Sequence, residues 1–368
     1  MTSPGESAVQ DLSHLVPGEL TEEEYFWRDH QRWLEKCGYM LRPRYKPDWV
    51  PSWEGTDTAY FSCEDGHENM YDQTLDATRI SDGAMVLLKR ISMSIHQYEV
   101  EIGQFFSSEP LASNARNHCV PIYDVLRVPD DEDIALLVMP LLRRYYDPRM
   151  QTIGEAVDFF RQIFEGLQFM HENHVAHRDC MNLNIMVDPK PLYPKMFHPL
   201  IQFATRDYGG TAKHYTRTGC PTKYYFIDFG LSRRFNPDGG PPREYPIFGG
   251  DKTVPEFRKS DEPCDPFPTD IYYLGNLIRE DFLQRFHGVE FILPLVNDMV
   301  QDEPENRPTI HQVVSRFAEI QNSLGYWQLR SRLVGLNEPL VVRIFLGIRQ
   351  FFRTVGYILT WRSPIPSP

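Results

Sequence analysis

Apolar residues recur every three or four positions in several stretches of this chain, which is the spacing of a helix with one buried face. One stretch runs from Ile95 to Phe106 and a longer one from Gly154 to Asn173. Residues 21–37 form a third, because Thr21 and Glu24 make a capping box at its start. The positions expected on the buried faces are Phe26, Trp33 and Leu34; 95, 98, 102, 105 and 106; and Val157, Phe160, Ile163, Phe164, Leu167 and Met170.

Other apolar runs are short and bounded by turn residues, as strands are. The run from Ala84 to Ser92 follows an Asp-Gly turn. Ile122 to Leu126 and Ile134 to Met139 flank an acidic loop, and together they predict a hairpin. Since strands come first and the long helices later, the predicted fold class is α+β, with a small sheet lobe and a larger helical lobe.

Composition narrows the class of protein. A chain of 368 residues suits one two-lobed domain with extensions, or two domains. The net charge of −13 and the lack of a long basic run argue against nucleic acid as the main partner. The six cysteines are scattered, which fits a reducing compartment. With no signal peptide in the first ten residues, an intracellular, cytoplasmic protein is expected.

The N-terminal region divides into two parts. Residues 1–20 are small and polar, and we expect them to be disordered. Residues 21–55 combine the first helix with a Pro-rich, aromatic extension from Arg42 to Trp53, which holds too many prolines for a helix or a central strand.

Two motifs carry candidate chemistry. His177 to Asn184 has the form H-R-D-x-x-x-x-N, and Asp228-Phe229-Gly230 follows the strand-like run Tyr224 to Ile227. In this order they supply a carboxylate that can accept a proton from a hydroxyl, and amide and carboxylate ligands for a metal. Phosphoryl transfer from a magnesium-bound nucleotide needs that set of groups.

On these motifs the chain resembles the eukaryotic protein kinase superfamily over roughly residues 70–325. The resemblance implies a two-lobed kinase-like domain that uses ATP and Mg²⁺. It implies that Asp179 orients or deprotonates the acceptor hydroxyl and that Asn184 and Asp228 are the magnesium ligands. The domain bounds that we expect are 56–325, with an N-lobe at about 56–140 and a C-lobe at about 141–325.

Three further residues are implied in nucleotide binding. Lys89 ends a run similar to the V-A-I-K strand, so it would contact the α- and β-phosphates and pair with a helix glutamate. Glu101 is favoured over Glu99 as that glutamate, because Ile102 and Phe105 then face the core. Leu137 to Leu142 resembles the hinge between lobes, where Met139 is similar to a gatekeeper and the backbone of Leu142 would bind adenine.

Later motifs resemble architectural parts of the same family. Val254-Pro255-Glu256 is similar to A-P-E, and Asp270 to Gly275 resembles the start of a central buried helix. Glu305 to Pro308 resembles the late arginine motif. The resemblance implies a buried ion pair between Glu256 and Arg307.

The chain departs from the family pattern in three places. The stretch 53–75, where a Gly-rich loop is expected, holds only two glycines, Gly55 and Gly66. Met181 and Leu183 stand where kinases carry a catalytic-loop cation. An insert at about 189–221 lengthens the segment before the D-F-G motif, and we expect a surface loop or an extra strand pair there.

The C-terminal tail, 326–368, changes in composition. Its six arginines face one acid, Glu338, and 340–361 reads as an amphipathic helix. Packing of its apolar face on the domain or on another chain is one interpretation, contact with a membrane surface is a second, and a membrane span is a third. The apolar positions are Ile344, Ile348, Phe351, Phe352, Val355, Ile358 and Leu359.

Three functions stay open at this point. The first is an ATP- and Mg²⁺-dependent protein kinase, with serine or threonine as the favoured acceptor. The second is a pseudokinase that acts as a nucleotide-binding or scaffold module, because the Gly-rich loop and the catalytic-loop lysine are missing. The third, phosphorylation of a small molecule, is less favoured. The expected partner is a protein substrate or a scaffold partner, and the oligomeric state is left open.

Overall fold

The computed structural model describes residues 19–69, 71–247, 249–259 and 262–368. Residues 1–18 lie outside the described residues, so disorder of the N-terminus stays a prediction.

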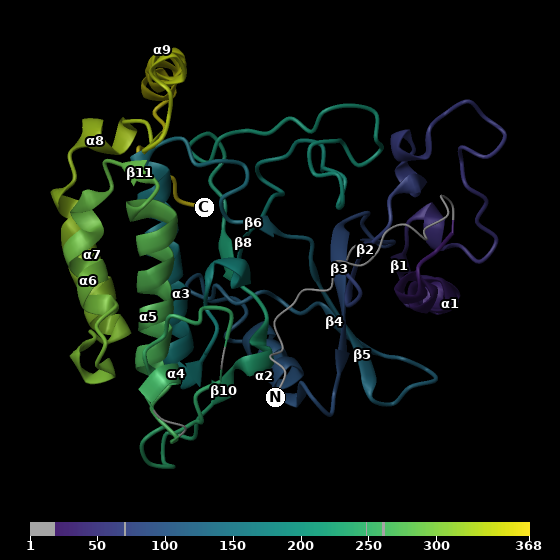
Figure 1. Ribbon diagram of the computed structural model, residues 1–368, viewed down its shortest axis with the longest axis horizontal. Coiled ribbons are helices and arrows are strands. Elements are labelled where there is room, and N and C mark those ends of the chain that lie inside the picture. The colour runs from purple at the N-terminus through teal and green to yellow at the C-terminus, as the bar shows by residue number, and fades with distance from the viewer. Residues whose placement is uncertain (1–18, 70, 248, 260–261) are drawn as a thin grey trace. The chain divides into compact units, whose positions relative to one another are not determined.

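The chain forms two compact units. The first holds the residues up to Lys89 together with 197–212, and the second holds 90–196 and 213–368. Antiparallel strands occur in both, and the long helix α3 lies in the second (Figure 1). This mixture of helices and antiparallel strands agrees with an α+β fold. The expected lobes follow other boundaries and stay a prediction.

The first unit begins with α1 (Glu22–Lys36), which starts at the predicted capping box. The Thr21 hydroxyl accepts a hydrogen bond from the Glu24 amide at 3.3 Å, and the Glu24 carboxylate accepts one from the Thr21 amide at 3.0 Å. Glu24 also pairs with Arg44 at 2.8 Å, and both side chains are 1% exposed. Burial alone would raise the pKa of Glu24, but the contacts from Arg44 outweigh it and lower the pKa.

The buried face of α1 is shifted from the expected one. Trp27 and Leu34 are fully buried, whereas Phe26 and Trp33 are only half-buried. The prediction was wrong by one position because several aromatic residues stand side by side in this helix, and spacing alone does not choose between neighbouring stripes. The capping residue Glu24 lies on the same buried side of the helix as Trp27. Its ion pair with Arg44 therefore helps to decide which side of α1 is buried.

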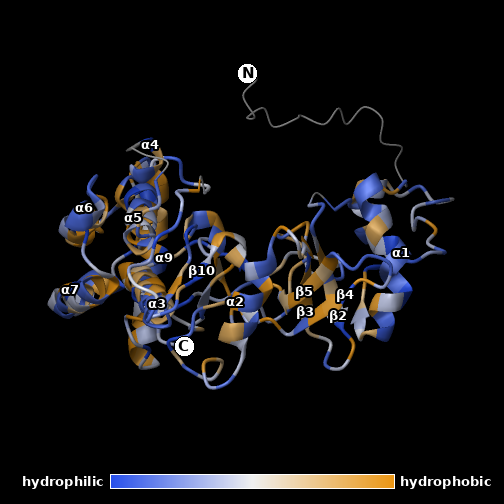
Figure 2. Ribbon diagram, turned by 90° about the horizontal axis from the view of Figure 1, so that it is seen from below, coloured by the Kyte–Doolittle hydropathy of each residue, from blue (hydrophilic) through white to orange (hydrophobic). Residues whose placement is uncertain are grey.

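Three antiparallel strands complete the regular structure of this unit: β1 (Tyr39–Met40), β2 (Thr74–Arg79) and β3 (Met85–Ser92). Tyr39 pairs with Arg79, and Thr74 pairs with Lys89. The alternation of buried and half-buried residues along β3 confirms the predicted strand. Both β3 and β5 (Ile134–Pro140), a strand of the second unit, are mainly hydrophobic in Figure 2.

The long insert contributes its middle part to the first unit. His198 is fully buried and contacts Glu64 at 3.1 Å, and His67 bonds the Tyr208 hydroxyl at 2.8 Å. Isolated bridges such as Phe197 to Thr205 stand where an extra strand pair was one of two expectations. This part of the insert therefore packs through buried polar groups and is more than a surface loop.

The second unit combines short strands with a group of helices. Its α-helices and strands in chain order are α2 (Gln97–Ser107), β4 (Asp124–Arg127), β5 (Ile134–Pro140), β6 (Arg143–Arg144), α3 (Ile153–Glu172), β7 (Val175–Ala176), β8 (Ile185–Val187), β9 (Tyr224–Phe226), β10 (Arg233–Arg234), α4 (Glu256–Lys259), α5 (Phe267–Ile278), β11 (Phe286–His287), α6 (Leu293–Met299), α7 (Ile310–Ser323), α8 (Tyr326–Arg330), β12 (Val334–Gly335) and α9 (Leu340–Leu359).

The core of this unit forms around α3, whose predicted apolar face is buried as expected. Its Phe164 ring lies 5.2 Å from that of Phe317 on α7, and Phe160 lies 4.7 Å from Phe282. The buried stripe of α5 includes Leu274 and Ile278, both fully buried, which confirms the predicted central helix. By contrast, the apolar side of α9 is exposed to solvent, so the expected packing of that face on the domain is wrong.

The predicted ion pair between Glu256 and Arg307 is present and buried. Two hydrogen bonds of 2.7 Å join the Arg307 guanidinium to the Glu256 carboxylate. The side chain of Arg307 is 0% exposed and that of Glu256 is 5% exposed. Thr269 donates a third bond to Glu256 at 2.8 Å. Burial by itself would raise the pKa of Glu256, but Arg307 and then Thr269 lower it more, so the pKa lies below its ordinary value.

Arg307→Met should lower the free energy of unfolding by about 3–5 kcal/mol at neutral pH, because it leaves a buried carboxylate without its partner. The pKa of Glu256 is depressed in the native chain, so the pair stabilises fully above the ordinary glutamate pKa and less as the pH falls through the lowered value. The loss should therefore shrink in acid. Unfolding with guanidinium chloride at several pH values measures this loss of unfolding free energy, with the double variant Glu256→Gln/Arg307→Met as control. A double variant as unstable as the single one would contradict this account.

Candidate active site

Strand pairing brings the two predicted metal ligands to the same end of a small sheet. β8 and β9 are antiparallel, with Ile185 opposite Phe226. Asn184 directly precedes β8, and Asp228 follows β9 by two residues. The Ile227 amide donates to the Asn184 carbonyl at 3.0 Å, which closes this end of the pair.

Asn184 holds the predicted catalytic carboxylate. Its side-chain Nδ2 donates to the Asp179 carbonyl at 2.9 Å and to Asp179 Oδ2 at 2.8 Å. Both bonds use the nitrogen, so the amide oxygen Oδ1 accepts no hydrogen bond from the described residues. Burial raises the pKa of Asp179, and the charge of Asp228 adds to the rise. The two carboxylates therefore lie close enough to influence each other.

A buried carboxylate on α5 fixes the backbone of the catalytic loop. Asp270 is fully buried and accepts the amide of His177 at 2.8 Å and the amide of Arg178 at 2.7 Å. It also accepts a bond from His171 Nε2 at 3.0 Å. Arg178 has a φ of 67°, a left-handed conformation that a side chain disfavours. The bonds from Asp270 hold this turn and thereby aim Asp179.

The D-F-G motif adopts a second strained turn. Asp228 has a φ of 64° and caps a short 3-10 turn, where its carboxylate accepts the Gly230 amide at 3.4 Å. Phe229 is 2% exposed, and its ring lies 5.7 Å from that of His177. The apolar anchor of Phe229 turns the Asp228 side chain away from the core, where it can meet a ligand.

The segment after the D-F-G motif lies on the carboxylate of Asp179. The Gly250 amide donates to Asp179 Oδ1 at 2.9 Å. A side chain on Gly250 would collide with Met181, and one on Gly249 would come within 2.6 Å of Asp179 Oδ1 and also meet the Tyr273 hydroxyl. Both glycines are needed for this close approach, and Met181 packs where a catalytic-loop lysine was looked for.

An acidic side chain ties the same segment to the catalytic loop. The Glu244 carboxylate lies 3.5 Å from Arg178 and 3.8 Å from Arg233. Arg178 also donates to the Tyr245 carbonyl at 2.7 Å, and Glu244 pairs with Cys264 through two backbone bonds of 2.9 Å. Sequence reasoning missed Glu244, since nothing in its local sequence points to arginines that precede it by 66 and 11 positions.

The two glutamates of α2 lie on different sides of the helix. Glu101, the favoured residue, is exposed, whereas Glu99 is 3% exposed. α2 packs on the turn that follows Asp228, and a Cβ on Gly230 would be 3.5 Å from Glu99 Oε2. Ile102 is buried as expected. However, its burial does not bring the neighbouring Glu101 onto the packed face of the helix, because Glu101 is exposed. Glu99 is the better candidate.

The remaining predicted residues occupy these positions. Lys89 lies on β3 opposite Thr74. Leu142 is half-buried between β5 and β6, and Met139 is 6% exposed at the end of β5. The connection from β1 to β2, residues 41–73, contains the short turns η2 (Pro43–Tyr45), η3 (Tyr60–Ser62) and η4 (Glu64–Gly66) where a Gly-rich loop was looked for.

Comparison with curated proteins now adds to this geometry. The chain is 22% identical over 298 residues to serine/threonine-protein kinase PTK2/STK2 of Saccharomyces cerevisiae, which is 76% of this chain and 32% of that protein. It is 32% identical over 79 residues to serine/threonine-protein kinase CAK1 of the same yeast, 21% of this chain and 20% of that protein.

These matches indicate a distant relationship to serine/threonine protein kinases. No model of a known protein family matches the chain. The chain spans about a third or less of the length of the kinases that it matches. The relationship therefore supports a kinase-like function in general, and the site residues rest on their own geometry.

The residues present fit a magnesium ion. Within the described ranges, no group of three or more His, Cys, Asp or Glu side chains could hold a metal. A magnesium–nucleotide site needs only one or two protein carboxylates, because phosphate and water supply the other oxygens. The Asn184 amide oxygen and the Asp228 carboxylate are ligands of that kind.

Gly249→Ala should displace the segment from Asp179, because the added methyl group has no room beside Asp179 and Tyr273. We expect a loss of roughly 1–3 kcal/mol from overpacking, seen as a lower melting temperature, and faster cleavage by trypsin after the exposed Lys252. Gly210→Ala is the matched control, since a Cβ there meets nothing within 4 Å. Equal melting and equal cleavage in both variants would show that the segment does not lie on Asp179.

Proposed function

We propose that this chain is an ATP- and Mg²⁺-dependent protein kinase that phosphorylates a serine or threonine hydroxyl. The observation that carries the proposal is the double hydrogen bond from Asn184 to Asp179, which orients a carboxylate and leaves an amide oxygen for a metal. The distant similarity to serine/threonine-protein kinases supports the same reaction.

Each site residue has a distinct part in the proposed reaction. Asn184 and Asp228 would hold Mg²⁺, which would supply positive charge to neutralise the phosphates of ATP. Lys89 contacts the α- and β-phosphates, and the backbone of Leu142 binds adenine. Asp179 receives a hydrogen bond from the acceptor hydroxyl, and its raised pKa suits it to take the proton as the bond to phosphorus forms.

Glu99, rather than Glu101, is our candidate for the glutamate that positions Lys89. The burial of Glu99 beside Gly230 supports this choice, because it places the Glu99 carboxylate at the D-F-G turn. The exposed position of Glu101 offers no such constraint.

A pseudokinase is the second candidate, and specific observations favour it. The stretch 53–75 has only two glycines, and its described residues form the short turns η3 and η4, so no Gly-rich backbone cradle for phosphates is seen among them. Met181 brings no charge to the phosphoryl group, and the Gly250 amide occupies one oxygen of Asp179. Phosphorylation of a small molecule is less favoured, because the buried pair of Glu256 and Arg307 resembles the protein-kinase branch.

The proposed setting is a reducing, intracellular one, cytoplasmic by default, with a protein as substrate or scaffold partner. All six cysteines are free thiols in the structure, which supports it. The acidic net charge of −13 supports a partner other than nucleic acid.

ATP with Mg²⁺ should raise the melting temperature of the chain, and the shift should be smaller in Asp228→Asn, which weakens the metal site.

Incorporation of labelled phosphate from ATP should fall by about 10²-fold or more in Asp179→Asn, because that variant cannot accept a proton. Asp131→Asn, at an exposed loop position, is the control. A shift without incorporation would select the pseudokinase, and no shift at millimolar nucleotide would rule out both nucleotide-dependent readings.

Glu99→Gln should raise the KM for ATP several-fold, while Glu101→Gln should leave it unchanged, because only Glu99 is buried beside the D-F-G turn. The two residues lie two positions apart on one helix, so each variant controls for the other. Steady-state kinetics at varied ATP measures the difference. An effect of Glu101→Gln alone would restore the assignment made from the sequence.

A further inference from the structure

Helix α9 presents its apolar side to solvent. At about 100° per residue, its exposed apolar residues other than Val342 fall within one arc that covers less than half of the helix. The most exposed are Val341 (79%), Leu359 (73%), Leu340 (70%), Phe352 (68%), Phe345 (66%) and Phe351 (65%). The helix contains no acidic residue, and its 20 residues extend over about 30 Å.

The opposite, polar side of α9 attaches it to the second unit. Gln350 is 7% exposed and donates to the Arg330 carbonyl at 3.5 Å. Arg353 donates to Gln151 at 3.2 Å, and the Tyr357 hydroxyl bonds that of Thr216. Polar contacts thus hold the helix by its polar side and leave its apolar face exposed.

Both ends of the helix are also fixed. Before its first residue, Glu338 receives a bond of 2.9 Å from Arg332 and lies 3.5 Å from Arg149. After its last residue, the Arg362 carbonyl accepts a bond from Arg330. The outward orientation is therefore built into the fold at three places along the helix.

A pocket lined by arginines opens along one flank of α9. It has a volume of about 170 Å³, and its walls include Arg149, Arg332, Arg349 and Arg353. Glu338 neutralises part of the charge of Arg149 and Arg332, and no acidic residue lines this pocket. Arg349 is exposed, and no described residue pairs with it. The flank therefore carries excess positive charge beside an apolar face.

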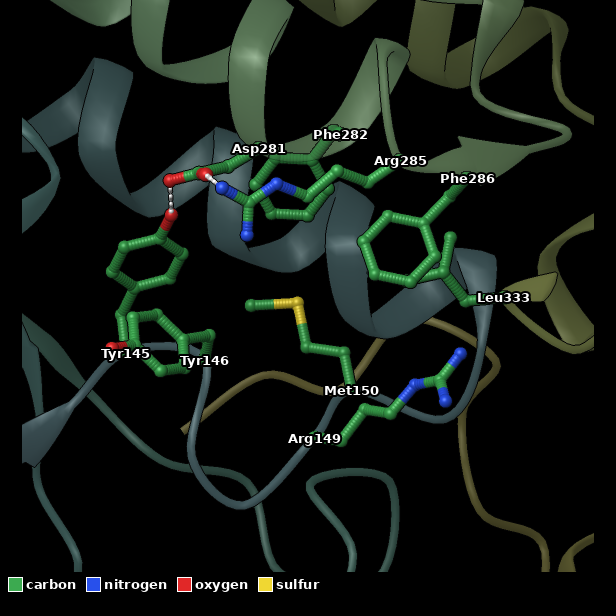
Figure 3. A pocket seen from close by; sticks show the side chains of 9 residues that line it. All are labelled: Tyr145, Tyr146, Arg149, Met150, Asp281, Phe282, Arg285, Phe286 and Leu333. Carbon is green, nitrogen blue, oxygen red and sulfur yellow. Dashed lines mark hydrogen bonds and ion pairs between the residues drawn. The ribbon is translucent and has the colours of Figure 1, made fainter. Parts of the chain in front are cut away.

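A neighbouring cavity of about 270 Å³ shows how the arginines divide between acids and solvent (Figure 3). Arg285 points to Asp281 at 2.8 Å, and Tyr145 donates to the same carboxylate at 2.5 Å. Arg149 points away from this pair and is half exposed. Its guanidinium belongs with the cationic flank of α9 rather than with the acidic group.

The occupant of this surface must match an apolar face with cationic borders. A second copy of the chain would place α9 against α9, where the arginines of both copies approach and no acid on either helix offsets them. An anionic lipid surface offers hydrocarbon to the apolar face and phosphates to the arginines. No helix in the described part of the chain combines the length and the apolar content needed to cross a bilayer, so α9 would lie along the surface.

We propose that α9 binds an anionic membrane surface, with its apolar face inserted and lipid phosphates bound by the exposed Arg349 at the border of that face. The proposal does not depend on the proposed kinase function. The positive charge beside α9 agrees with the local composition of residues 330–368, which is basic although the whole chain carries a net charge of −13. The second unit would then be held at the membrane through the only long helix that carries its polar side inward among the described residues.

Flotation of the full chain with vesicles tests the proposal. Wild type should float with vesicles of phosphatidylcholine and phosphatidylserine, weakly with phosphatidylcholine alone, and less as salt rises. Phe345→Ser/Phe352→Ser should reduce flotation by tenfold or more, and Arg349→Glu should reduce it several-fold only on anionic vesicles. The matched controls are Phe203→Ser, at an aromatic residue that is 73% exposed elsewhere, and Arg127→Glu, at an exposed arginine of β4.

Several outcomes would overturn the proposal. The chain could fail to float with either vesicle, or float equally well in the α9 variants and the controls. Sedimentation could instead show a dimer that Phe345→Ser/Phe352→Ser dissociates, in which case the face joins two copies. Equal binding to both vesicle types would refute the part assigned to the arginines. Since the α9 substitutions lie at exposed positions, unchanged melting temperatures should show that folding is intact.

Discussion

The rest of the site depends on the hydrogen bonds that the buried carboxylate of Asp270 accepts. A charged group with no access to solvent is tolerated only when hydrogen bonds replace its water. Here the amides of His177 and Arg178 and the ring of His171 supply them, at 2.7–3.0 Å. The loop from His177 to Asn184 belongs to no long strand or helix. The bonds to Asp270 therefore satisfy the backbone amides of His177 and Arg178, which would otherwise be buried without partners.

The same principle extends outward from Asp270 to the segment that covers the loop. Arg178, held by its amide, turns its guanidinium toward the carbonyls of Leu231 and Tyr245 and toward Glu244. Glu256 at the far end of the segment is fixed by Arg307. A segment with little regular structure is thereby tied at both ends by charges, and its glycines approach Asp179. Within this segment Glu244 supplies a negative charge to two arginines, Arg178 and Arg233.

Helix α9 obeys the reverse rule. In α3 and α5 the apolar faces are buried, and buried carboxylates such as Glu155 and Asp270 accept hydrogen bonds, whereas in α9 the polar face is held and the apolar face is exposed. A long exposed apolar stripe is costly in water and marks a binding surface. The arginines along its border, rather than the stripe itself, are the reason that we propose a lipid surface as the partner, because an anionic surface offers negative charge along the whole helix.

Local features could be predicted from the sequence alone, because short-range bonding and periodic burial leave their mark on neighbouring residues. The capping box of Thr21 and Glu24, the buried face of α3, and the order of Asp179, Asn184 and Asp228 are of this kind. Tertiary structure decided the choices between neighbours and between distant residues. Glu99 rather than Glu101 is buried, Trp27 rather than Phe26 faces the core, and Glu244 meets Arg178 across 66 positions. Helix spacing gives a stripe's period but not its phase, and it cannot show which charges the chain brings together, because those depend on packing between segments far apart in the sequence.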